Sequence, residues 1–306
     1  CTGFTTYTTM TNNLNWQQIS EQITQATQLP FAITATRAVA GGSINAAYII
    51  QSDNKSYFVK FNQRQTLAMF EAEFLGLEEL AQSHTVTVPR PLLYGLTDSH
   101  SFIIMEKLSL SPRQSSSEQS LGHQLAQLHK IQQNYFGWHC NNTIGSTQQI
   151  NDPSQDWVSF WANHRLGYQL SLACQHGYGG RLSQSGYRLA ESLAGFFSHY
   201  SPHPALLHGD LWSGNAAMTS LSQPVIYDPA CYYGDRETDI AMTELFGGFS
   251  ADFYAAYNEN YPLHSDYPIR KTLYNLYHIL NHLNLFGEGY LHQAQTMIDS
   301  LLSEIS

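Results

Sequence analysis

Along the first hundred residues, apolar and polar positions follow the period of strands more often than the period of helices. Helical spacing predicts two helices in this part of the chain, at 13–28 and 66–82. Extended segments are predicted at 34–40, 45–52, 56–62, 86–96 and 101–110. Strands grouped around one helix form an α+β pattern, which differs from the regular alternation of a parallel α/β sheet.

Helical spacing dominates the rest of the chain. We expect helices at 121–132, 154–175, 183–199, 237–258, 267–286 and 288–304. Turn residues and short apolar runs interrupt them at 206–218 and 224–235. A serine-rich stretch with a proline, 111–119, separates the two patterns, so we predict an N-terminal lobe over 13–108 and a larger, mainly helical lobe over 109–306.

Composition narrows the classes of function. Charged residues make up only 12% of the 306, and 24 acidic against 14 basic residues give a net charge of −10. This balance argues against binding to nucleic acid phosphates and suits a cationic partner better. The sequence has no apolar run near 18 residues, no signal-peptide pattern in 1–12 and only four widely spaced cysteines. We therefore expect a cytoplasmic protein without membrane or nucleic acid partners, and without a zinc or disulfide framework.

The strongest chemical signal is the run HGDLWSGN at 208–215, with Asp228 after the next short apolar stretch. Asp210 and Asn215 lie five positions apart on one compact loop, where Asp228 can join them. Such oxygen donors suit Mg²⁺, which completes its coordination with water and phosphate oxygens. Taken singly, each residue is better explained as the cap of a turn or helix. The three together favour a metal-assisted site.

The spacing of this run matches H-x-D-x-x-x-x-N, the catalytic-loop pattern of protein kinases. In that pattern the Asp meets the substrate hydroxyl and the Asn meets a metal ion. Gly209 replaces the usual Arg, and Asp228 is followed by Pro instead of Phe-Gly. These departures indicate a small-molecule kinase that shares the protein-kinase fold.

Residues that bind a nucleotide are expected in the N-terminal half. Gly41, Gly42 and Ser43 lie between two predicted strands, where the missing side chains would let backbone N–H groups approach phosphate oxygens. An ordinary Gly-Gly hairpin is the commoner explanation of such a pair. The sequence lacks G-x-x-x-x-G-K-[ST], which excludes a P-loop NTPase.

Lys60 stands in an otherwise apolar strand, YFVKF. Glu71 and Glu73 on the following helix come within its range, and we predict that Glu73 pairs with it, as a strand lysine and a helix glutamate do in kinases. The alternatives are an edge-strand lysine and a solvated helix face.

A strand also emerges into Met105, Glu106, Lys107 and Leu108, between the two predicted lobes. This segment is a natural hinge, where backbone groups of Met105, Glu106 and Leu108 would recognise adenine. An ordinary strand end is the alternative.

Ten stretches together resemble one known family, the fructosamine and ketosamine kinases of the aminoglycoside-phosphotransferase-like branch of the kinase fold. The stretches are GGSINAAY, FVKFN, MFEAEFLGL, VPRPL, FIIMEKLSL, LGHQLAQLH, FGWHCNNTIGSTQQIN, LLHGDLWSGN, YDPACYYGDRETDIAMTELFGGF and LYHILNHLNLFGEGYL. They cover nearly the whole chain after about residue 15. LLHGDLWSGN with YYGDRETDIAMTELFGGF is highly specific, whereas H-G-D-x-x-x-x-N alone would also admit choline and aminoglycoside kinases.

The resemblance implies a bilobal protein-kinase-like fold, with an N-terminal antiparallel sheet plus helix and a larger, mainly helical C-terminal lobe. It also implies ATP-dependent phosphorylation, with Mg²⁺, of a sugar hydroxyl on a ketosamine. The activity of the family implies that this hydroxyl is O3. In eukaryotic relatives this step begins the repair of glycated protein. A free or protein-bound ketosamine, such as a fructosamine or ribulosamine adduct of lysine, is the expected substrate.

Residue by residue, the resemblance makes Asp210 the base or positioner of the attacking hydroxyl and makes Asn215 and Asp228 the Mg²⁺ ligands. It makes Lys60 and Glu73 the phosphate-binding pair. Asp239 has a family counterpart that braces the catalytic loop. Asp235 stands where many members carry His, so the contact at that position is open.

Substrate selection is less readable. Trp212, beside the predicted base, can stack on a sugar face, and Arg165 lies with Trp157 and Trp161 on a family-like helix near the presumed cleft. Core packing is the alternative for these residues, and we favour it for Trp161. His208 is expected to hold its loop rather than to bind metal.

Two other functions stay open at this point. The first is a kinase of the same fold that acts on another amine-bearing alcohol, such as an aminoglycoside or choline. FGWHCNNTIGSTQQIN and NHLNLFGEGYL favour ketosamines over these acceptors. The second is a catalytically silent binding protein, which the intact Lys60, Asp210, Asn215 and Asp228 oppose.

Overall fold

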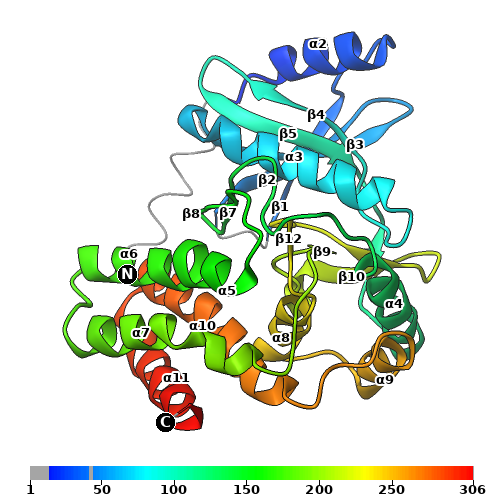
Figure 1. Ribbon diagram of the computed structural model, residues 1–306. Helices are drawn as coiled ribbons and strands as arrows, with labels where there is room; N and C mark the ends of the chain where they lie inside the picture. Colours follow the sequence, from blue (N-terminus) through cyan, green and yellow to red (C-terminus); the bar gives the residue numbers. More distant parts are fainter. Residues whose placement is uncertain (1–13, 41–43, 306) are drawn as a thin grey trace. The chain divides into compact units, whose positions relative to one another are not determined.

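The computed structural model describes residues 14–40 and 44–305, and Figure 1 shows its ribbon. The chain divides into two compact units, with the division between Leu110 and Ser111. Gly41, Gly42 and Ser43 lie outside the described residues.

The described residues of the first unit form a five-stranded sheet with two helices and one short 3-10 turn. Its strands are antiparallel in the order β1-β2-β3-β5-β4. They are β1 (Ala35–Val39), β2 (Ala46–Gln51), β3 (Ser56–Gln63), β4 (Pro91–Leu96) and β5 (His100–Glu106). The helical elements are α2 (Trp16–Thr27), η1 (Arg64–Thr66) and α3 (Leu67–Gln82). Each strand and helix predicted for this part is present, but β4 begins five residues later than the predicted strand over 86–96, and β5 ends four residues before the predicted end at 110.

Strand β3 shows how the alternation of side chains builds this unit. Tyr57, Val59 and Phe61 are buried in one apolar cluster together with Ile19 and Ile23 of α2. Successive side chains of a strand point to opposite faces of the sheet, so Lys60 points to the other face. There it meets α3, the helix that carries Glu73.

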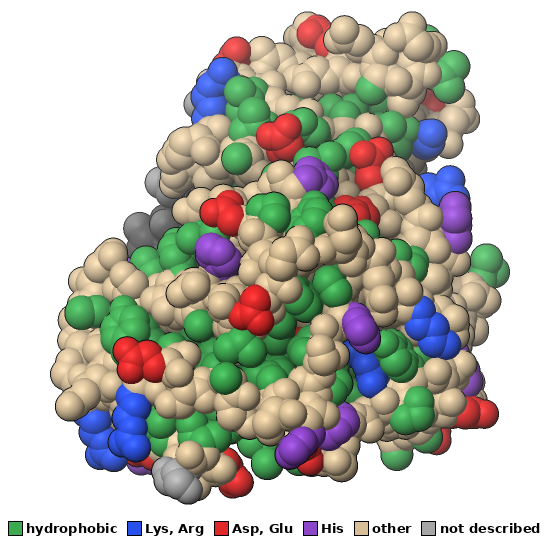
Figure 2. All heavy atoms as spheres, viewed as in Figure 1, with side chains coloured by type: hydrophobic (Ala, Val, Ile, Leu, Met, Phe, Trp, Pro, Cys, Tyr) green, Lys and Arg blue, Asp and Glu red, His purple; other side chains and the backbone are tan. Residues whose placement is uncertain are grey.

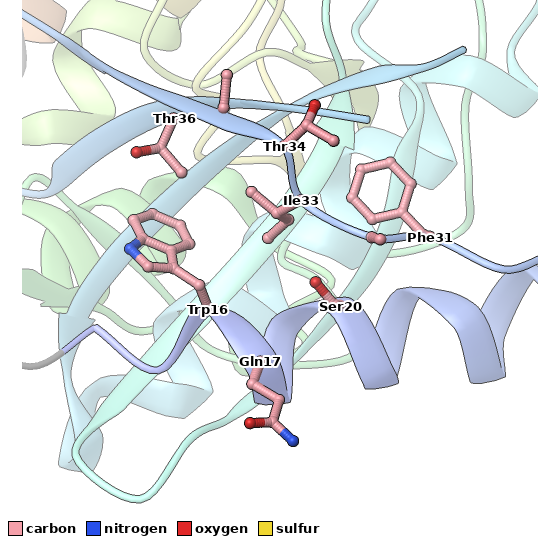
Figure 3. Close-up of a pocket in the computed structure, with 9 residues that line it drawn as sticks. Trp16, Gln17, Ser20, Phe31, Ile33, Thr34 and Thr36 are labelled. Atoms are coloured by element: carbon pink, nitrogen blue, oxygen red, sulfur yellow. The ribbon is translucent and has the colours of Figure 1, made fainter. Parts of the chain in front are cut away.

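A pocket of about 480 Å³ opens between α2 and the segment that leads into β1. Figure 3 shows Ile33 between Trp16 and Phe31 in this pocket, with the polar Ser20 and Thr34 nearby. No residue predicted for the functional site lines this pocket.

The second unit is mainly helical, as predicted. Its helices are α4 (Ser115–Leu128), α5 (Trp157–Phe160), α6 (Tyr168–Gln175), α7 (Arg181–Glu191), α8 (Glu237–Leu245), α9 (Ala251–Asn260), α10 (Tyr267–Phe286) and α11 (Leu291–Glu304). The π-helix η2 (Trp161–Gly167) and the 3-10 turns η3 (Leu193–Phe197), η4 (Ser213–Asn215) and η5 (Glu288–Tyr290) lie between them. Figure 1 shows α10 beside α6, α8 and α11, which it contacts.

The single helix predicted over 237–258 is wrong. The structure has two helices, α8 and α9, because the chain turns at Gly247 and Gly248, which have φ angles of +95° and +64°. Side chains rarely adopt these angles, and glycine does so without strain. The helix predicted over 183–199 also ends early, at Glu191, and continues only as the 3-10 turn η3.

Short strands accompany the helices of this unit, and the first of them, β6, begins at the last residue of the first unit. They are β6 (Leu110–Ser111), β7 (Asn142–Ile144), β8 (Thr147–Gln149), β9 (Ala205–Leu207), β10 (Ala216–Thr219), β11 (Pro224–Ile226) and β12 (Tyr232–Gly234). β7 pairs with β8, β9 with β12 and β10 with β11, all antiparallel. The hairpin of β7 and β8 was not expected from the sequence.

The surface carries few basic groups. On the face shown in Figure 2, Lys and Arg side chains stand apart or in small groups and do not cover a continuous surface. Among residues 14–40 and 44–305, none of the helices has the length and apolar character needed to cross a bilayer.

Candidate active site

The loop that carries Asp210 follows β9 directly. Because Leu207 of β9 pairs with Tyr232 of β12, the start of this loop lies beside the segment 227–231 that precedes β12. The loop then turns tightly, with the Trp212 N–H donating to the Asp210 carbonyl at 3.1 Å and the Asn215 N–H to the Trp212 carbonyl at 3.0 Å. The sheet pairing and this turn bring both predicted halves of the site into one place.

Asp239 at the start of α8 fixes the beginning of the loop. Its carboxylate accepts the backbone N–H groups of His208 and Gly209, both at 2.8 Å, and lies 3.2 Å from Nε2 of His129. Burial alone would raise the pKa of Asp239, but the hydrogen bonds from His129 and Gly209 hold that pKa below its ordinary value. The brace that the family resemblance implies is therefore present, and His129 of α4 is part of it.

His208 is buried and holds the loop through both ring nitrogens. Its Nε2 donates to the Tyr227 carbonyl at 3.0 Å, and its Nδ1 accepts the Asp210 N–H at 3.2 Å. Burial lowers the pKa of His208, which keeps the ring neutral and suits one nitrogen as donor and the other as acceptor. His208 thus links the loop to the residue before Asp228.

Asn215 joins the predicted oxygen donors. Its Nδ2 donates to the Asp210 backbone carbonyl at 2.9 Å and to Asp210 Oδ2 at 3.2 Å. The backbone carbonyl of Asn215 accepts the Tyr227 N–H at 3.0 Å. Because its amide nitrogen is bonded to Asp210, Asn215 has its side-chain oxygen Oδ1 left to coordinate a cation. Asp228 follows Tyr227 directly, so the three predicted residues meet at this point.

The electrostatics around Asp210 and Asp228 favour binding of a cation. Burial and the negative charge of Asp228 hold the pKa of Asp210 well above its ordinary value, while the hydrogen bond from Asn215 acts in the opposite direction. A cation beside the two carboxylates would relieve their repulsion. Asp228 itself is exposed and has a φ of +58°, a conformation that Asp tolerates better than most residues.

The donor set fits Mg²⁺ in a nucleotide complex. Asp228 offers a carboxylate and Asn215 an amide oxygen, and Mg²⁺ takes its remaining ligands from phosphates and water. Among the described residues, no three His, Cys, Asp or Glu side chains converge on a metal site. A cation held by one carboxylate, one amide and phosphate oxygens does not require such a cluster.

The chain packs closely behind the loop at Gly209. The Ala230 N–H donates to the His208 carbonyl at 2.8 Å, and Gly209 has a φ of +82°. A Cβ atom built on Gly209 would lie 2.0 Å from the Ala230 carbonyl oxygen. This position therefore has no space for a side chain.

In the first unit, Lys60 and Glu73 form the predicted ion pair, with 2.6 Å between Nζ and Oε1. Both side chains are largely buried. Glu71, the other candidate partner, instead accepts a hydrogen bond from the Tyr94 hydroxyl at 2.7 Å. The binding of phosphate by Lys60 stays a prediction.

The hinge residues lie at the end of β5. Met105 is buried, Leu108 is half-buried, and the Glu106 side chain is exposed. The Glu106 N–H donates to the Arg90 carbonyl at 2.8 Å, so a contact of this residue with adenine would not use that N–H. Adenine recognition here stays a prediction.

The two predicted substrate residues have different surroundings. Trp212 is 38% exposed, and its indole lies over Gly214, where an added Cβ would come within 2.2 Å of the ring. Arg165 is buried on η2, with its guanidinium over the rings of Phe160 and Tyr232. Its NH2 group donates to Asn151 Oδ1 at 2.8 Å, so Arg165 contacts protein groups instead of solvent.

Trp157 and Trp161 are buried in the aromatic core of the second unit, which agrees with the core packing favoured for Trp161. Asp235, whose contact the sequence left open, is also buried. It accepts hydrogen bonds from the hydroxyls of Tyr200, at 2.8 Å, and Tyr274.

Sequence reasoning missed two groups around the site. His129, in LGHQLAQLHK, reaches Asp239, and the amides of Asn142, Gln149 and Asn151 are buried beside the segment after Asp228. The dense run of amides in FGWHCNNTIGSTQQIN was the available signal for the second group.

Known proteins resemble the chain over nearly its full length. The sequence model of the fructosamine kinase family matches residues 15–304. A probable ketoamine kinase of Synechocystis is 47% identical over 94% of this chain and 97% of its own. The chloroplastic protein-ribulosamine 3-kinase of Arabidopsis thaliana is 44% identical, covering 88% of this chain and 83% of its own.

Solved structures agree with the sequence relatives. A Haemophilus somnus protein assigned to fructosamine-3-kinase superposes with a TM-score of 0.86 and 32% identity, over 94% of this chain and 97% of its own. The choline kinase LicA of Streptococcus pneumoniae has a TM-score of 0.60 at 15% identity, over 94% of this chain and 99% of its own. This second likeness shows the fold alone, which is the predicted protein-kinase-like fold. The chain belongs to the fructosamine kinase family.

Proposed function

We propose that the protein is an ATP-dependent ketosamine 3-kinase, which transfers the γ-phosphate of ATP to O3 of the sugar in fructosamine or ribulosamine adducts of lysine. Family membership makes the protein a kinase with a sugar hydroxyl as acceptor. The single observation that carries the proposal is the pair of hydrogen bonds made by Asn215. Its side-chain amide donates to the Asp210 carboxylate, and its backbone carbonyl accepts the N–H of the residue before Asp228.

Asp210 accepts the hydrogen bond of the attacking hydroxyl and orients its oxygen toward the γ-phosphate. Phosphoryl transfer requires little covalent chemistry from the protein, so in-line positioning supplies much of the rate. The His208 ring and the Asp239 carboxylate hold the backbone on the N-terminal side of Asp210. The Asn215 amide holds its carboxylate.

Asn215 and Asp228 are the proposed ligands of Mg²⁺, which when bound neutralises charge on the nucleotide phosphates. Lys60 is the proposed cation for the phosphates on the side of the first unit, and Glu73 orients it through the 2.6 Å ion pair. Gly41, Gly42 and Ser43 are proposed to contact the phosphates through backbone N–H groups. Adenine recognition is assigned to the hinge at Met105, Glu106 and Leu108.

For the acceptor, Trp212 presents a partly exposed indole two residues from Asp210, where a sugar ring can stack on it. The net charge of −10 favours the cationic remainder of a lysine adduct. Arg165 is proposed to act on the site through the residues that it holds, since its guanidinium is buried among protein groups.

A substrate panel tests the proposal. We expect ADP release with ribulose-lysine and fructose-lysine, and no release above background with kanamycin or choline. The position of the phosphate on the sugar is checked by ³¹P–¹H correlation NMR of the product. Turnover of kanamycin or choline alone would assign the protein to the other phosphotransferases of this fold. Binding of ATP without transfer to any acceptor would assign it to silent binding proteins.

A further inference from the structure

The hairpin of β7 and β8 presents two buried amides side by side. Asn142 and Gln149 are directly opposed across the hairpin, and Gln149 Nε2 donates to Asn142 Oδ1 at 2.9 Å. Their exposed fractions are 7% and 1%. Gln148, between buried neighbours on the same strand, is exposed. Buried amides need partners, so the contacts of Asn142 and Gln149 are part of the fold rather than incidental.

Both amides donate to the backbone just after Asp228. Gln149 Nε2 lies 3.2 Å from the Ala230 carbonyl, and Asn142 Nδ2 lies 2.7 Å from the Cys231 carbonyl. The Ala230 N–H in turn donates to the His208 carbonyl at 2.8 Å. Ala230 is therefore held from one side by the hairpin and from the other by the loop that carries Asp210.

The residue before Asp228 is fixed as well. The Tyr227 N–H donates to the Asn215 carbonyl, and its carbonyl accepts from the His208 ring. Asp228 lies between these two fixed points with a φ of +58°. A left-handed conformation at a residue with a side chain persists only where the surrounding structure imposes it. The hydrogen bonds of the hairpin to the Ala230 and Cys231 carbonyls contribute to that constraint.

The hairpin amides are themselves oriented by further buried groups. The Tyr277 hydroxyl of α10 donates to Gln149 Oε1 at 2.8 Å. Asn151 Nδ2 donates to Asn142 Oδ1 at 2.9 Å, and Arg165 NH2 donates to Asn151 Oδ1 at 2.8 Å. With Oε1 occupied by the tyrosine, Gln149 has to direct Nε2 to Asn142 and Ala230.

We propose that Gln149 is a positioning residue, which sets the orientation of Asp228 by fixing the Ala230 carbonyl. The inference rests on the proposed role of Asp228 as a metal ligand. Outer residues that orient metal ligands typically change metal affinity by about 10–100-fold when they are replaced. Gln149 thereby couples the β7–β8 hairpin to the metal-binding half of the site.

The test compares Gln149→Glu with the matched control Gln148→Glu on the same strand. The first variant keeps an oxygen for the Tyr277 hydroxyl and removes the Nε2 donor, whereas the second adds the same charge at an exposed position. Hydrogen exchange is followed by mass spectrometry in peptides covering 224–234, without nucleotide or metal. We expect Q149E to exchange about tenfold faster there, and Q148E to match the wild type.

Metal binding is the second readout, with Mn²⁺ titrated by EPR in the presence of a non-hydrolysable ATP analogue. We expect Q149E to raise the dissociation constant of Mn²⁺ at least about tenfold. If Q149E does not fold, Tyr277→Phe removes only the hydrogen bond to Gln149 Oε1, and we expect the same two changes in the same directions.

Unchanged exchange in peptides 224–234, or a lower melting temperature with unchanged Mn²⁺ affinity, would overturn the proposal. The exchange measurement needs no substrate, so it is independent of the acceptor. If wild-type protein failed to phosphorylate any ketosamine while Q149E still accelerated exchange and weakened Mn²⁺ binding, the proposed function would fail and the positioning role would stand.

Discussion

The loop around Asp210 and the buried cluster around Asp239 use the same side chain for opposite purposes. Asp239 receives two backbone N–H groups and a histidine nitrogen, and these donors lower its pKa despite complete burial. Burial and the facing charge of Asp228 raise the pKa of Asp210, which receives a side-chain hydrogen bond from one amide, that of Asn215. The number of donors, rather than the depth of burial, distinguishes the two carboxylates.

This difference teaches which carboxylate the fold depends on. A carboxylate whose charge is satisfied by protein donors stabilises the folded chain, whereas one whose charge is left to repel a neighbour destabilises it until a cation arrives. Asp239 therefore stabilises the fold, whereas the charge of Asp210 is stabilised only when a cation binds. Four predictions test this contrast.

Replacing Asp210 should give the largest effect. We expect Asp210→Ala to lower kcat at least about a hundredfold, because a positioned acid or base typically contributes about 10²–10⁴-fold. In metal-free buffer the same variant should melt at a slightly higher temperature than the wild type, since the repulsion with Asp228 is removed. Asp210→Asn is the isosteric control. A loss of kcat below tenfold would contradict the assigned role.

Replacing Asp239 should act on stability instead. We expect Asp239→Asn to lower the free energy of unfolding by about 3 kcal/mol, because an amide cannot accept all three hydrogen bonds and the buried partners are left unsatisfied. Urea denaturation measures the change. Asp299→Asn is the matched control, since Asp299 pairs with Arg181 at the surface, where such pairs contribute about 0–1 kcal/mol. Equal losses at both positions would remove the contrast.

The first unit extends the comparison to a buried cation, because Lys60 is held there by its ion pair with Glu73. Lys60→Met should lower kcat/KM for ATP by about 10–100-fold, the worth of a hydrogen bond to a charged group. Glu73→Gln should cost less, since the lysine charge stays while its partner is weakened. Steady-state kinetics at varied ATP measures both. Lys55→Met, at an exposed lysine in the turn between β2 and β3, is the control, and an equal loss there would refute the role of Lys60.

The smallest effect concerns a buried histidine. Burial lowers the pKa of His278 on α10 to about 3, so between pH 6.5 and about 3 the unfolded chain binds a proton that the folded chain does not. Stability should therefore fall with falling pH by about 1.4 kcal/mol per unit from this group. His278→Gln should flatten the slope by that amount in urea titrations at pH 7, 6 and 5.

His292→Gln replaces a histidine on the exposed face of α11 and controls for the substitution itself. The same slope in wild type and His278→Gln would show that His278 takes up its proton in the folded state.

Much of the fold could be predicted, because periodicity reports burial directly. The alternation around Lys60 and the apolar face of α3 gave the sheet and helix of the first unit. The break between α8 and α9 was missed because the apolar spacing on both sides was given more weight than the Gly247-Gly248 pair, a turn signal that the positive φ angles bear out. Strands β7 and β8 have three residues each, and all but Ile144 are polar, so they are too short and too polar to show a detectable alternation.

The site divides in the same way. Asp210, Asn215 and Asp228 were found because local spacing carries their pattern. His129 and Gln149 were missed because their contacts lie far away in the sequence, with 110 positions to Asp239 and 81 to Ala230. Their partners are set by the packing of helices and hairpins, which spacing does not encode.

The close approach of the Ala230 oxygen to Gly209 constrains how this loop can change. Alanine, the smallest replacement, would already push its methyl group into that oxygen, and the positive φ would add strain. An arginine, which protein kinases carry at this position, would require the segment after Asp228 to follow another path. Conversion between the two loop types therefore demands concerted replacement of two separate segments, and an intermediate with only one of them altered would be sterically blocked.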